Sequence, residues 1–304
     1  MDYNDIYIKY KNKYLELKYN NMIGGKNNEI VIVLFGGSFS SKVRWQYAFE
    51  GKSTLRKIDF MDELKKIGNV YSFNYEHFNL NYYANSPNKE EAKMWKKIID
   101  KYQYFNENID FSIEDLDYKN ICSKTYNIIK NMYGDNKKYI VIGHSYGGSL
   151  ALLFSKLYKN ECILCCCLDN PPYVEEFYKE HNENDNKNIL EKYKNNKDLQ
   201  NSLDIVKKTK DQEIRNNEID NLFKFIMYKS SQDRIKYLSK KLYVPTIFFK
   251  RQDDQWNKYN NKEKNQFKKD KNLKGYIVRK NVGHYIWENK DFSDLIIKTI
   301  KENI

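Results

Sequence analysis

Short apolar runs alternate with longer amphipathic segments along most of the chain, from residue 29 to its end. The apolar runs predict buried strands at 29–35, 69–75, 137–143, 161–169, 243–250 and 275–280. Apolar residues at helical spacing predict helices between them, at 57–68, 89–102, 118–133, 149–158, 218–238 and 291–304. Since the strands are apolar almost throughout and alternate with helices, they favour a mostly parallel sheet covered by helices on both faces.

The first 28 residues form a separate segment with a different pattern. One apolar stripe, with alternating spacings of four and three, predicts a basic amphipathic helix, and its members are Tyr3, Tyr7, Tyr10, Tyr14 and Leu17. Gly24 and Gly25 provide a stop at its C-terminal end. The helix could dock on a partner or pack against the following domain, and the pattern leaves both interpretations open.

A strongly polar segment at 173–240 interrupts the alternation of strands and helices. It contains neither glycine nor proline, and its apolar residues keep a helical spacing. We therefore expect one α/β domain over 29–304, with a helical lid inserted at about 173–240.

Composition narrows the class of protein. The 304 residues suffice for a substantial core, although only 40% are hydrophobic. No stretch approaches the roughly 20 apolar residues of a membrane span, and the N-terminus lacks the apolar run of a secretory signal, so we expect a protein that is not secreted. The net charge of +12 can mark nucleic-acid binding, but the lysines are scattered along the whole chain, and no nucleic-acid partner is expected.

Four of the five cysteines lie in one apolar run, "ECILCCCLD" at 161–169. Neighbouring residues of a strand point to opposite faces, so these thiols cannot converge on one metal ion. We interpret them as small buried hydrophobic residues. Free buried thiols suit a reducing compartment.

The sequence "YIVIGHSYGGSLALLF" at 139–154 changes from strand to helix at a G-x-S-x-G motif. A serine on this tight turn is presented above the edge of the sheet, and the glycines two positions away avoid steric clashes. The pattern therefore predicts that Ser145 is a nucleophile rather than a packed core residue.

A serine nucleophile needs a general base, and the chain has four histidines. His144 lies inside the turn and should point away from the hydroxyl of Ser145. His77 follows an early strand, and His181 lies in the polar segment. His284 follows the last predicted strand, and loops at the carboxyl ends of parallel strands share one edge, so we predict that His284 is the base.

The third member of a serine triad is an acid that orients the imidazole, and in this arrangement it lies between the serine and the histidine in sequence. Two candidates follow the strand at 243–250, in "KRQDDQW". The register favours Asp254, and Asp253 remains the alternative.

Two backbone N–H groups should stabilise the developing oxyanion. One is that of Tyr146, which follows the nucleophile. The other should come from the glycine-rich loop at 35–42, where Gly37 is the predicted donor and Ser38 the alternative. This loop does not have the register of a phosphate-binding loop.

Together these motifs resemble the α/β-hydrolase superfamily over residues 29–304. The resemblance rests on the glycine loop and on "GHSYGG", "VPTIFFKRQDD" and "VGHYIWEN". In the family, the acid usually lies three residues after a glycine that ends its strand; Arg251 has that place here, which points to Asp254. Phe35 stands where the family commonly has histidine, so the hydrogen bonds that brace the oxyanion loop are missing.

The resemblance implies an α/β-hydrolase fold and a serine hydrolase that cleaves a carboxylic ester or related acyl substrate, a small molecule, through an acyl-enzyme. Such a mechanism requires no metal and no cofactor. A thioesterase, an acyltransferase or a peptidase would use the same triad. A non-catalytic binding or virion protein with this fold is the alternative from a different class.

The N-terminal segment, "YIKYKNKYLELKYNNMIGG", resembles a leader found on many proteins of Mimivirus-like giant DNA viruses. Together with the reduced thiols, this resemblance implies a location in the cytoplasm or in a virus particle.

Overall fold

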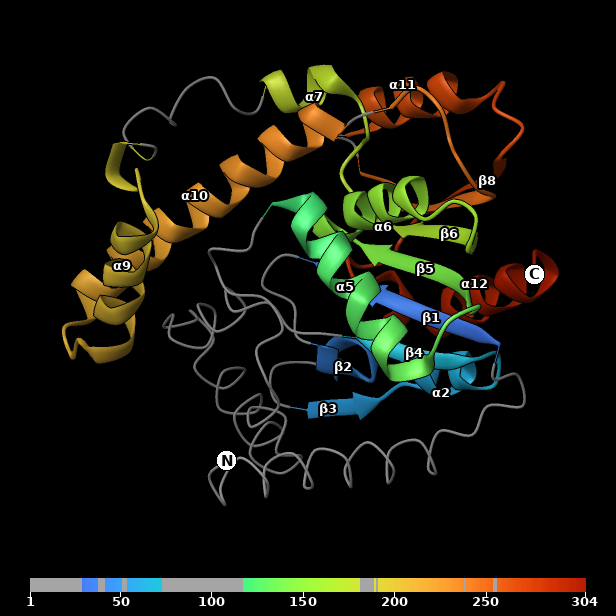
Figure 1. Ribbon diagram of the computed structural model, residues 1–304, viewed down its shortest axis with the longest axis horizontal. Coiled ribbons are helices and arrows are strands. Elements are labelled where there is room, and N and C mark those ends of the chain that lie inside the picture. The colour runs from blue at the N-terminus through green and yellow to red at the C-terminus, as the bar shows by residue number, and fades with distance from the viewer. Residues whose placement is uncertain are drawn as a thin grey trace.

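The computed structural model (Figure 1) describes residues 29–37, 42–50, 54–72, 117–180, 189, 191–237, 239–253 and 256–304. The predicted N-terminal helix, the predicted helix at 89–102 and two of the histidines, His77 and His181, lie outside these residues.

Six strands form one sheet in the order β4-β1-β5-β6-β7-β8, and every neighbouring pair is parallel. The strands are β1 (Ile30–Phe35), β4 (Asn69–Ser72), β5 (Lys138–His144), β6 (Cys162–Leu168), β7 (Thr246–Arg251) and β8 (Leu273–Arg279). All six predicted strands are present. The sequence did not predict a small antiparallel hairpin, formed by β2 (Tyr47–Glu50) and β3 (Thr54–Lys57).

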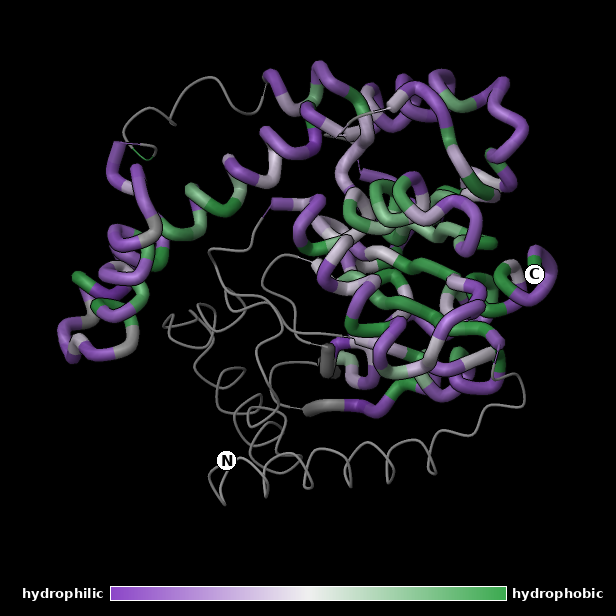
Figure 2. Tube along the Cα trace, in the orientation of Figure 1, coloured by the Kyte–Doolittle hydropathy of each residue, from purple (hydrophilic) through white to green (hydrophobic). Residues whose placement is uncertain are grey.

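Helices cover both faces of the sheet, as the alternating pattern predicts. On one face, α5 (Tyr118–Tyr133), α6 (Tyr146–Leu157) and α11 (Asn257–Phe267) pack on Val31, Val33 and Phe248. On the other face, α2 (Phe60–Lys65) and α12 (Lys290–Glu302) pack on Ile32 and Leu34. Figure 2 shows the result as a hydrophobic centre surrounded by more hydrophilic helices.

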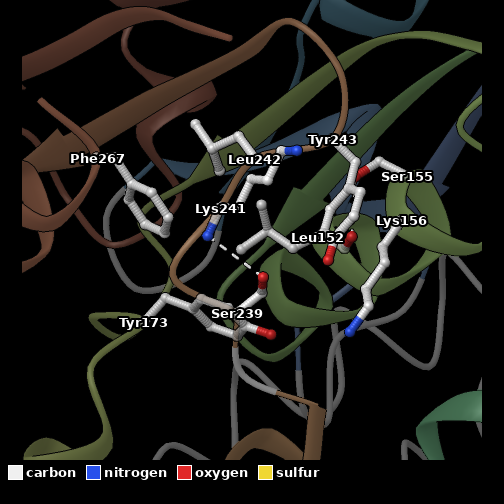
Figure 3. Close-up of a pocket in the computed structure, with 9 residues that line it drawn as sticks. All are labelled: Leu152, Ser155, Lys156, Tyr173, Ser239, Lys241, Leu242, Tyr243 and Phe267. Atoms are coloured by element: carbon white, nitrogen blue, oxygen red, sulfur yellow. Dashed lines mark hydrogen bonds between the residues drawn. The ribbon is translucent and has the colours of Figure 1, made fainter. Parts of the chain in front are cut away.

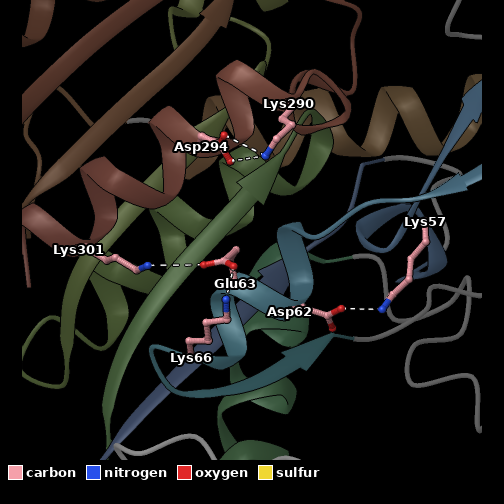
Figure 4. Close-up of polar contacts among 7 residues, drawn as sticks. All are labelled: Lys57, Asp62, Glu63, Lys66, Lys290, Asp294 and Lys301. Atoms are coloured by element: carbon pink, nitrogen blue, oxygen red, sulfur yellow. Dashed lines mark hydrogen bonds and ion pairs between the residues drawn. The ribbon is translucent and has the colours of Figure 1, made fainter.

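Charged side chains join α2 to its neighbours at the surface (Figure 4). Lys301 of α12 lies 3.6 Å from Glu63 of α2, which also contacts Lys66. Lys57 of β3 lies 2.7 Å from Asp62. Since these side chains are largely exposed, solvent and salt screen each pair, and the apolar contacts beneath them hold the layer.

Three helices lie in the segment predicted as a lid: α7 (Glu175–Glu180), α9 (Asn196–Lys208) and α10 (Gln212–Tyr237). α9 and α10 share a small apolar core of their own, which includes Leu203, Val206 and Leu222. At the left of Figure 1, α9 and the adjoining part of α10 stand apart from the sheet, whereas the C-terminal end of α10 contacts α5 and α6. The helical content agrees with the sequence pattern, and the role of the segment as a lid stays a prediction.

All five cysteines are free and buried. Cys165 and Cys167 lie in the core on the α6 side of the sheet, and Cys166 lies on the opposite side. Burial raises the pKa of the Cys165 and Cys166 thiols well above its usual value, so these thiols remain protonated. This confirms their interpretation as small core residues.

Candidate active site

Ser145 lies at the turn between β5 and α6 with φ 51° and ψ −119°. A positive φ is uncommon for a residue with a side chain, and such strain is concentrated at functional sites. The surrounding backbone holds the turn, because the Ser145 N–H donates to the Leu168 carbonyl at 3.0 Å and the Ser145 carbonyl accepts from the Gly148 N–H at 3.0 Å.

Close backbone approach explains the two glycines of the motif. A Cβ atom at Gly143 would lie 2.1 Å from the Gly147 carbonyl oxygen, and a Cβ atom at Gly147 would lie 2.1 Å from the Phe35 carbonyl oxygen. Neither position tolerates a side chain unless the backbone moves. The second contact also seats the end of β1 directly against the first turn of α6, beside Ser145.

His284 follows β8 and contacts a buried carboxylate. Its Nδ1 lies 2.6 Å from Oδ2 of Asp169, whose side chain is 2% exposed, whereas that of His284 is 35% exposed. Asp169 is the first residue after β6 and has φ 42°. Since an ionised carboxylate can only accept, Nδ1 carries the proton in this contact, and Nε2 is the nitrogen left for proton transfer.

His144 connects the serine turn to the loop that carries His284. Its Nε2 lies 3.0 Å from the His284 carbonyl oxygen, and the centroids of the two rings are 4.5 Å apart. Burial lowers the pKa of His144 well below its usual value, so the ring is neutral and Nε2–H donates to the carbonyl. Ser145 is the next residue, and His284 therefore lies at the same edge of the sheet as the predicted nucleophile.

Aromatic side chains surround His144 and brace this loop. The ring centroids of Trp45 and Trp287 are 4.3 Å apart, and that of Trp287 lies 4.6 Å from the His144 centroid. The Trp287 indole donates to the Arg44 carbonyl at 2.9 Å, and the Arg44 guanidinium lies 3.9 Å from the centre of the Tyr285 ring. Closely packed, buried rings restrict one another's rotamers. This packing therefore fixes the loop that carries His284.

Arg251, at the end of β7, contacts the same carboxylate. Its Nε lies 2.9 Å from Asp169 Oδ2 without the alignment of a hydrogen bond, and its backbone N–H donates to Asp169 Oδ1 at 3.2 Å. Its Nη2 also lies 2.8 Å from Asp253 Oδ2. Arg251 thus joins two acidic side chains.

A buried ion pair holds the chain that follows Asp169. Lys250 and Glu263 lie 2.9 Å apart with side chains 1% and 0% exposed. The Lys250 ammonium donates to the Asn170 carbonyl at 2.7 Å, and Glu263 accepts from the Tyr173 N–H at 2.6 Å and from the Tyr276 hydroxyl at 2.7 Å. Each charge has several partners, which is the condition under which a buried pair is tolerated.

The structure brings together some of the predicted residues. Ser145 and His284 share one edge of the sheet, whereas Asp253 pairs with Arg251 and makes no described contact with His284. Asp254 and Ser38 lie outside the described residues, so these two assignments stay predictions. The carboxylate that the structure places on His284 is Asp169, which the sequence analysis did not consider as the acid.

One signal in the sequence could have identified Asp169. An apolar strand that ends directly in an acidic residue places that residue at the carboxyl edge, and 161–169 ends in this way. The strand at 243–250 is followed by acidic residues too, so the pattern alone could not choose between the two strand ends.

The predicted oxyanion donors lie next to each other in the fold. Tyr146 is the first residue of α6, and Gly37 is buried just after β1. The contact of Gly147 with the carbonyls of Phe35 and Gly36 brings these two segments together. First-turn N–H groups of a helix have no partner within the helix, so this is a suitable place for an anion. The two donors themselves stay predictions.

The two pockets that the structure describes lie outside this constellation. One, of about 10 Å³, lies between Leu152, Tyr173 and Phe267 (Figure 3) and has room for about one water molecule. The other is an open groove of about 390 Å³ between α2 and α12, lined mainly by charged residues. Four of them, Glu63, Lys290, Asp294 and Lys301, are drawn in Figure 4. In the described ranges, no group of three potential metal ligands comes together. No helix among these residues is both long and apolar enough to cross a membrane.

Known structures identify the fold. A protein from Acinetobacter baumannii AYE, assigned as a lipase, superposes with a TM-score of 0.51 and 16% identity over 95% of this chain and 94% of that one. The chain has the α/β-hydrolase fold. A marine microorganism esterase and an epoxide hydrolase from Vigna radiata each align with a TM-score of 0.49, at 16% and 12% identity, over 92% and 90% of this chain and 97% and 91% of theirs.

Both of these TM-scores lie below 0.5. No protein-family model matches the chain, and no curated protein matches it. At such low identity the likeness concerns the fold, and the chemistry must be argued from the site.

Proposed function

We propose that this protein is a serine hydrolase that cleaves a carboxylic ester or a related acyl substrate, with Ser145 as nucleophile, His284 as general base and Asp169 as the acid that orients it. The observation that carries the proposal is the 2.6 Å contact between His284 Nδ1 and the buried Asp169 carboxylate, at the edge where Ser145 is presented. A strained serine, a histidine with a free second nitrogen and a buried orienting acid are the parts of a triad.

The reaction follows from these positions. His284 Nε2 takes the proton of the Ser145 hydroxyl while the serine oxygen attacks the substrate carbonyl carbon. The N–H groups of Tyr146 and Gly37 are the donors for the resulting oxyanion. The protonated His284 gives its proton to the leaving group, which departs and leaves an acyl-enzyme. Water, deprotonated by His284, then attacks the acyl-enzyme and releases the acid and the free serine.

Asp169 acts through His284 and does not touch substrate. It holds the tautomer with the proton on Nδ1 and stabilises the imidazolium that forms when Nε2 takes a proton. Arg251 also holds the acid in place, because its Nε lies 2.9 Å from the same carboxylate oxygen and its backbone N–H donates to the other oxygen. We also propose that the segment at 173–240 covers the site as a lid.

A serine-directed fluorophosphonate probe tests the proposal on the full-length chain. We expect a covalent adduct on Ser145, located by peptide mass spectrometry, and no adduct in Ser145→Ala. Labelling of His284→Ala should be slower by about a thousandfold or more. Folded protein without any adduct would contradict the proposal and favour a non-catalytic binding protein.

The leaving group is a separate question, because thioesterases, acyltransferases and peptidases use the same triad. A series of p-nitrophenyl esters and acyl-CoA thioesters of increasing chain length separates these chemistries. We expect the oxygen esters to be hydrolysed, and higher kcat/KM for every thioester would correct the assignment to a thioesterase.

A further inference from the structure

Arg234 is a buried cation close to the serine turn that the mechanism does not use. It lies in the last turns of α10 and is 2% exposed. Its guanidinium carbon lies 5.2 Å from the centre of the Tyr178 ring and 5.8 Å from that of the Tyr146 ring. Tyr146 directly follows Ser145 in sequence and is the first residue of α6, so the charge lies beside a side chain from the N-terminal turn of α6.

The surroundings of Arg234 do not neutralise its charge. Its Nε has no hydrogen-bond partner, and the described part of the chain places no carboxylate at ion-pair distance from it. Arginine stays protonated in proteins, and a buried guanidinium is costly unless it is paired. Ring faces compensate for only part of that cost.

The polar groups nearby are neutral phenols. Burial raises the pKa of both Tyr118 and Tyr178, so neither hydroxyl is ionised at neutral pH. The Tyr118 hydroxyl interacts with the guanidinium but is already hydrogen-bonded to Ser230 at 2.8 Å. The neighbouring carboxylate of Asp233 accepts from the Tyr118 N–H at 3.0 Å.

Three elements bring this cation to the catalytic edge. The Tyr118 ring, at the start of α5, lies 5.2 Å from the Tyr146 ring at the start of α6. Tyr178 belongs to α7, which follows Asp169 after a short connection. Since no carboxylate among the described residues compensates its charge, the buried guanidinium favours an anion near the start of α6.

We propose that Arg234 binds a carboxylate of the substrate, and that the hydrolase acts on acyl esters with a free carboxylate on the acyl group, such as half-esters of short dicarboxylic acids. The planar guanidinium can pair with a carboxylate through two parallel hydrogen bonds. This inference rests on the proposed hydrolase function, since it assigns the substrate class of that site.

Two p-nitrophenyl esters with acyl chains of five carbons test the inference: the half-ester of glutaric acid and the neutral valerate. We expect the wild-type protein to have a KM about 10- to 100-fold lower for the anionic ester. Arg234→Met should remove this preference by raising the KM of the anionic ester much more than that of the valerate, and Arg234→Lys should restore part of it. Lys229→Met, which removes an exposed charge from the same helix, is the matched control and should keep the preference.

The results separate this inference from the proposed function. Equal KM values for the two wild-type reactions, or a preference that survives Arg234→Met while Ser145 is still labelled by fluorophosphonate, would overturn the subsite. Calorimetry of free glutarate with the Ser145→Ala protein needs no catalysis. Binding that is lost in Ser145→Ala/Arg234→Met supports the subsite even if no ester is cleaved, and absence of binding to Ser145→Ala overturns it.

Discussion

Two buried aspartates at the carboxyl side of the sheet have opposite surroundings. Asp169 is 2% exposed and contacts a histidine at 2.6 Å and an arginine at 2.9 Å. Asp233 is 6% exposed, accepts one backbone hydrogen bond, and has no cation at ion-pair distance among the described residues. Burial raises the pKa of Asp233 to about 6. Both carboxylates are buried, but they differ in their partners. The partners therefore decide whether a buried carboxylate can orient a base.

The largest effect should come from removing the charge of Asp169. Asp169→Asn keeps the size of the side chain but allows the wrong tautomer of His284, so we expect kcat/KM to fall by about 10³- to 10⁴-fold. The measurement is steady-state hydrolysis of the best p-nitrophenyl ester.

Asp253→Asn is the matched control for this variant and should cost less than about threefold, because Asp253 contacts Arg251 and not His284. The Asp254→Asn variant tests the prediction made from the sequence. A large loss in Asp254→Asn with a small loss in Asp169→Asn would reverse the assignment of the acid.

Removing one partner of the Lys250–Glu263 pair should have the next largest effect. Lys250→Met leaves the fully buried Glu263 without its cation, and we expect a loss of about 3–5 kcal/mol in the free energy of unfolding, measured by urea denaturation. Lys250→Met/Glu263→Gln removes both charges and should regain much of that loss. A single variant as stable as the wild type would show that a partnerless carboxylate is tolerated there.

Replacing Arg251 should have a smaller effect. Its guanidinium contacts Asp169, whereas Asp233 has no cation at ion-pair distance among the described residues. Arg251→Met removes a positive charge and a support of the acid, so kcat/KM should fall about 3- to 10-fold. The control is Arg279→Met, which removes an exposed charge from the paired residue of β8 and should leave kcat/KM within about twofold of the wild-type value. Wild-type kcat/KM in Arg251→Met would show that Asp169 does not need this support.

The smallest effect should come from replacing Asp233, the second of the two buried aspartates. A carboxylate with a pKa of about 6 when folded, against about 4 when unfolded, binds more protons in the folded state between these values. Stability should therefore fall as pH rises from about 4 to 6.

Asp233→Asn removes this dependence and should gain about 1 kcal/mol in the free energy of unfolding relative to the wild type between pH 4 and pH 7. The measurement is urea denaturation at the two pH values, and an unchanged difference between the two proteins would show that Asp233 is ionised at no cost.

The alternating apolar pattern predicted the six-stranded sheet and the helices on its two faces, because fully buried parallel strands must be apolar on both sides. The apolar pattern did not predict α11, and the buried residues of this helix explain why. Two of its four buried side chains, those of Asn260 and Glu263, are polar, so the helix has no continuous apolar stripe. The hairpin of β2 and β3 was missed as well; each of its strands has only four residues.

The sequence by itself determined where Ser145 and His284 lie, because a strand–turn–helix motif and a strand end are local features. It could not determine which carboxylate meets His284, since acidic residues follow both β6 and β7. Only the tertiary structure showed that this carboxylate is Asp169, whose partner is 115 residues away. Likewise, only packing placed a buried arginine of α10 beside the ring of Tyr146. Local periodicity records which residues are buried, whereas the partners of a buried charge are chosen by contacts between distant segments.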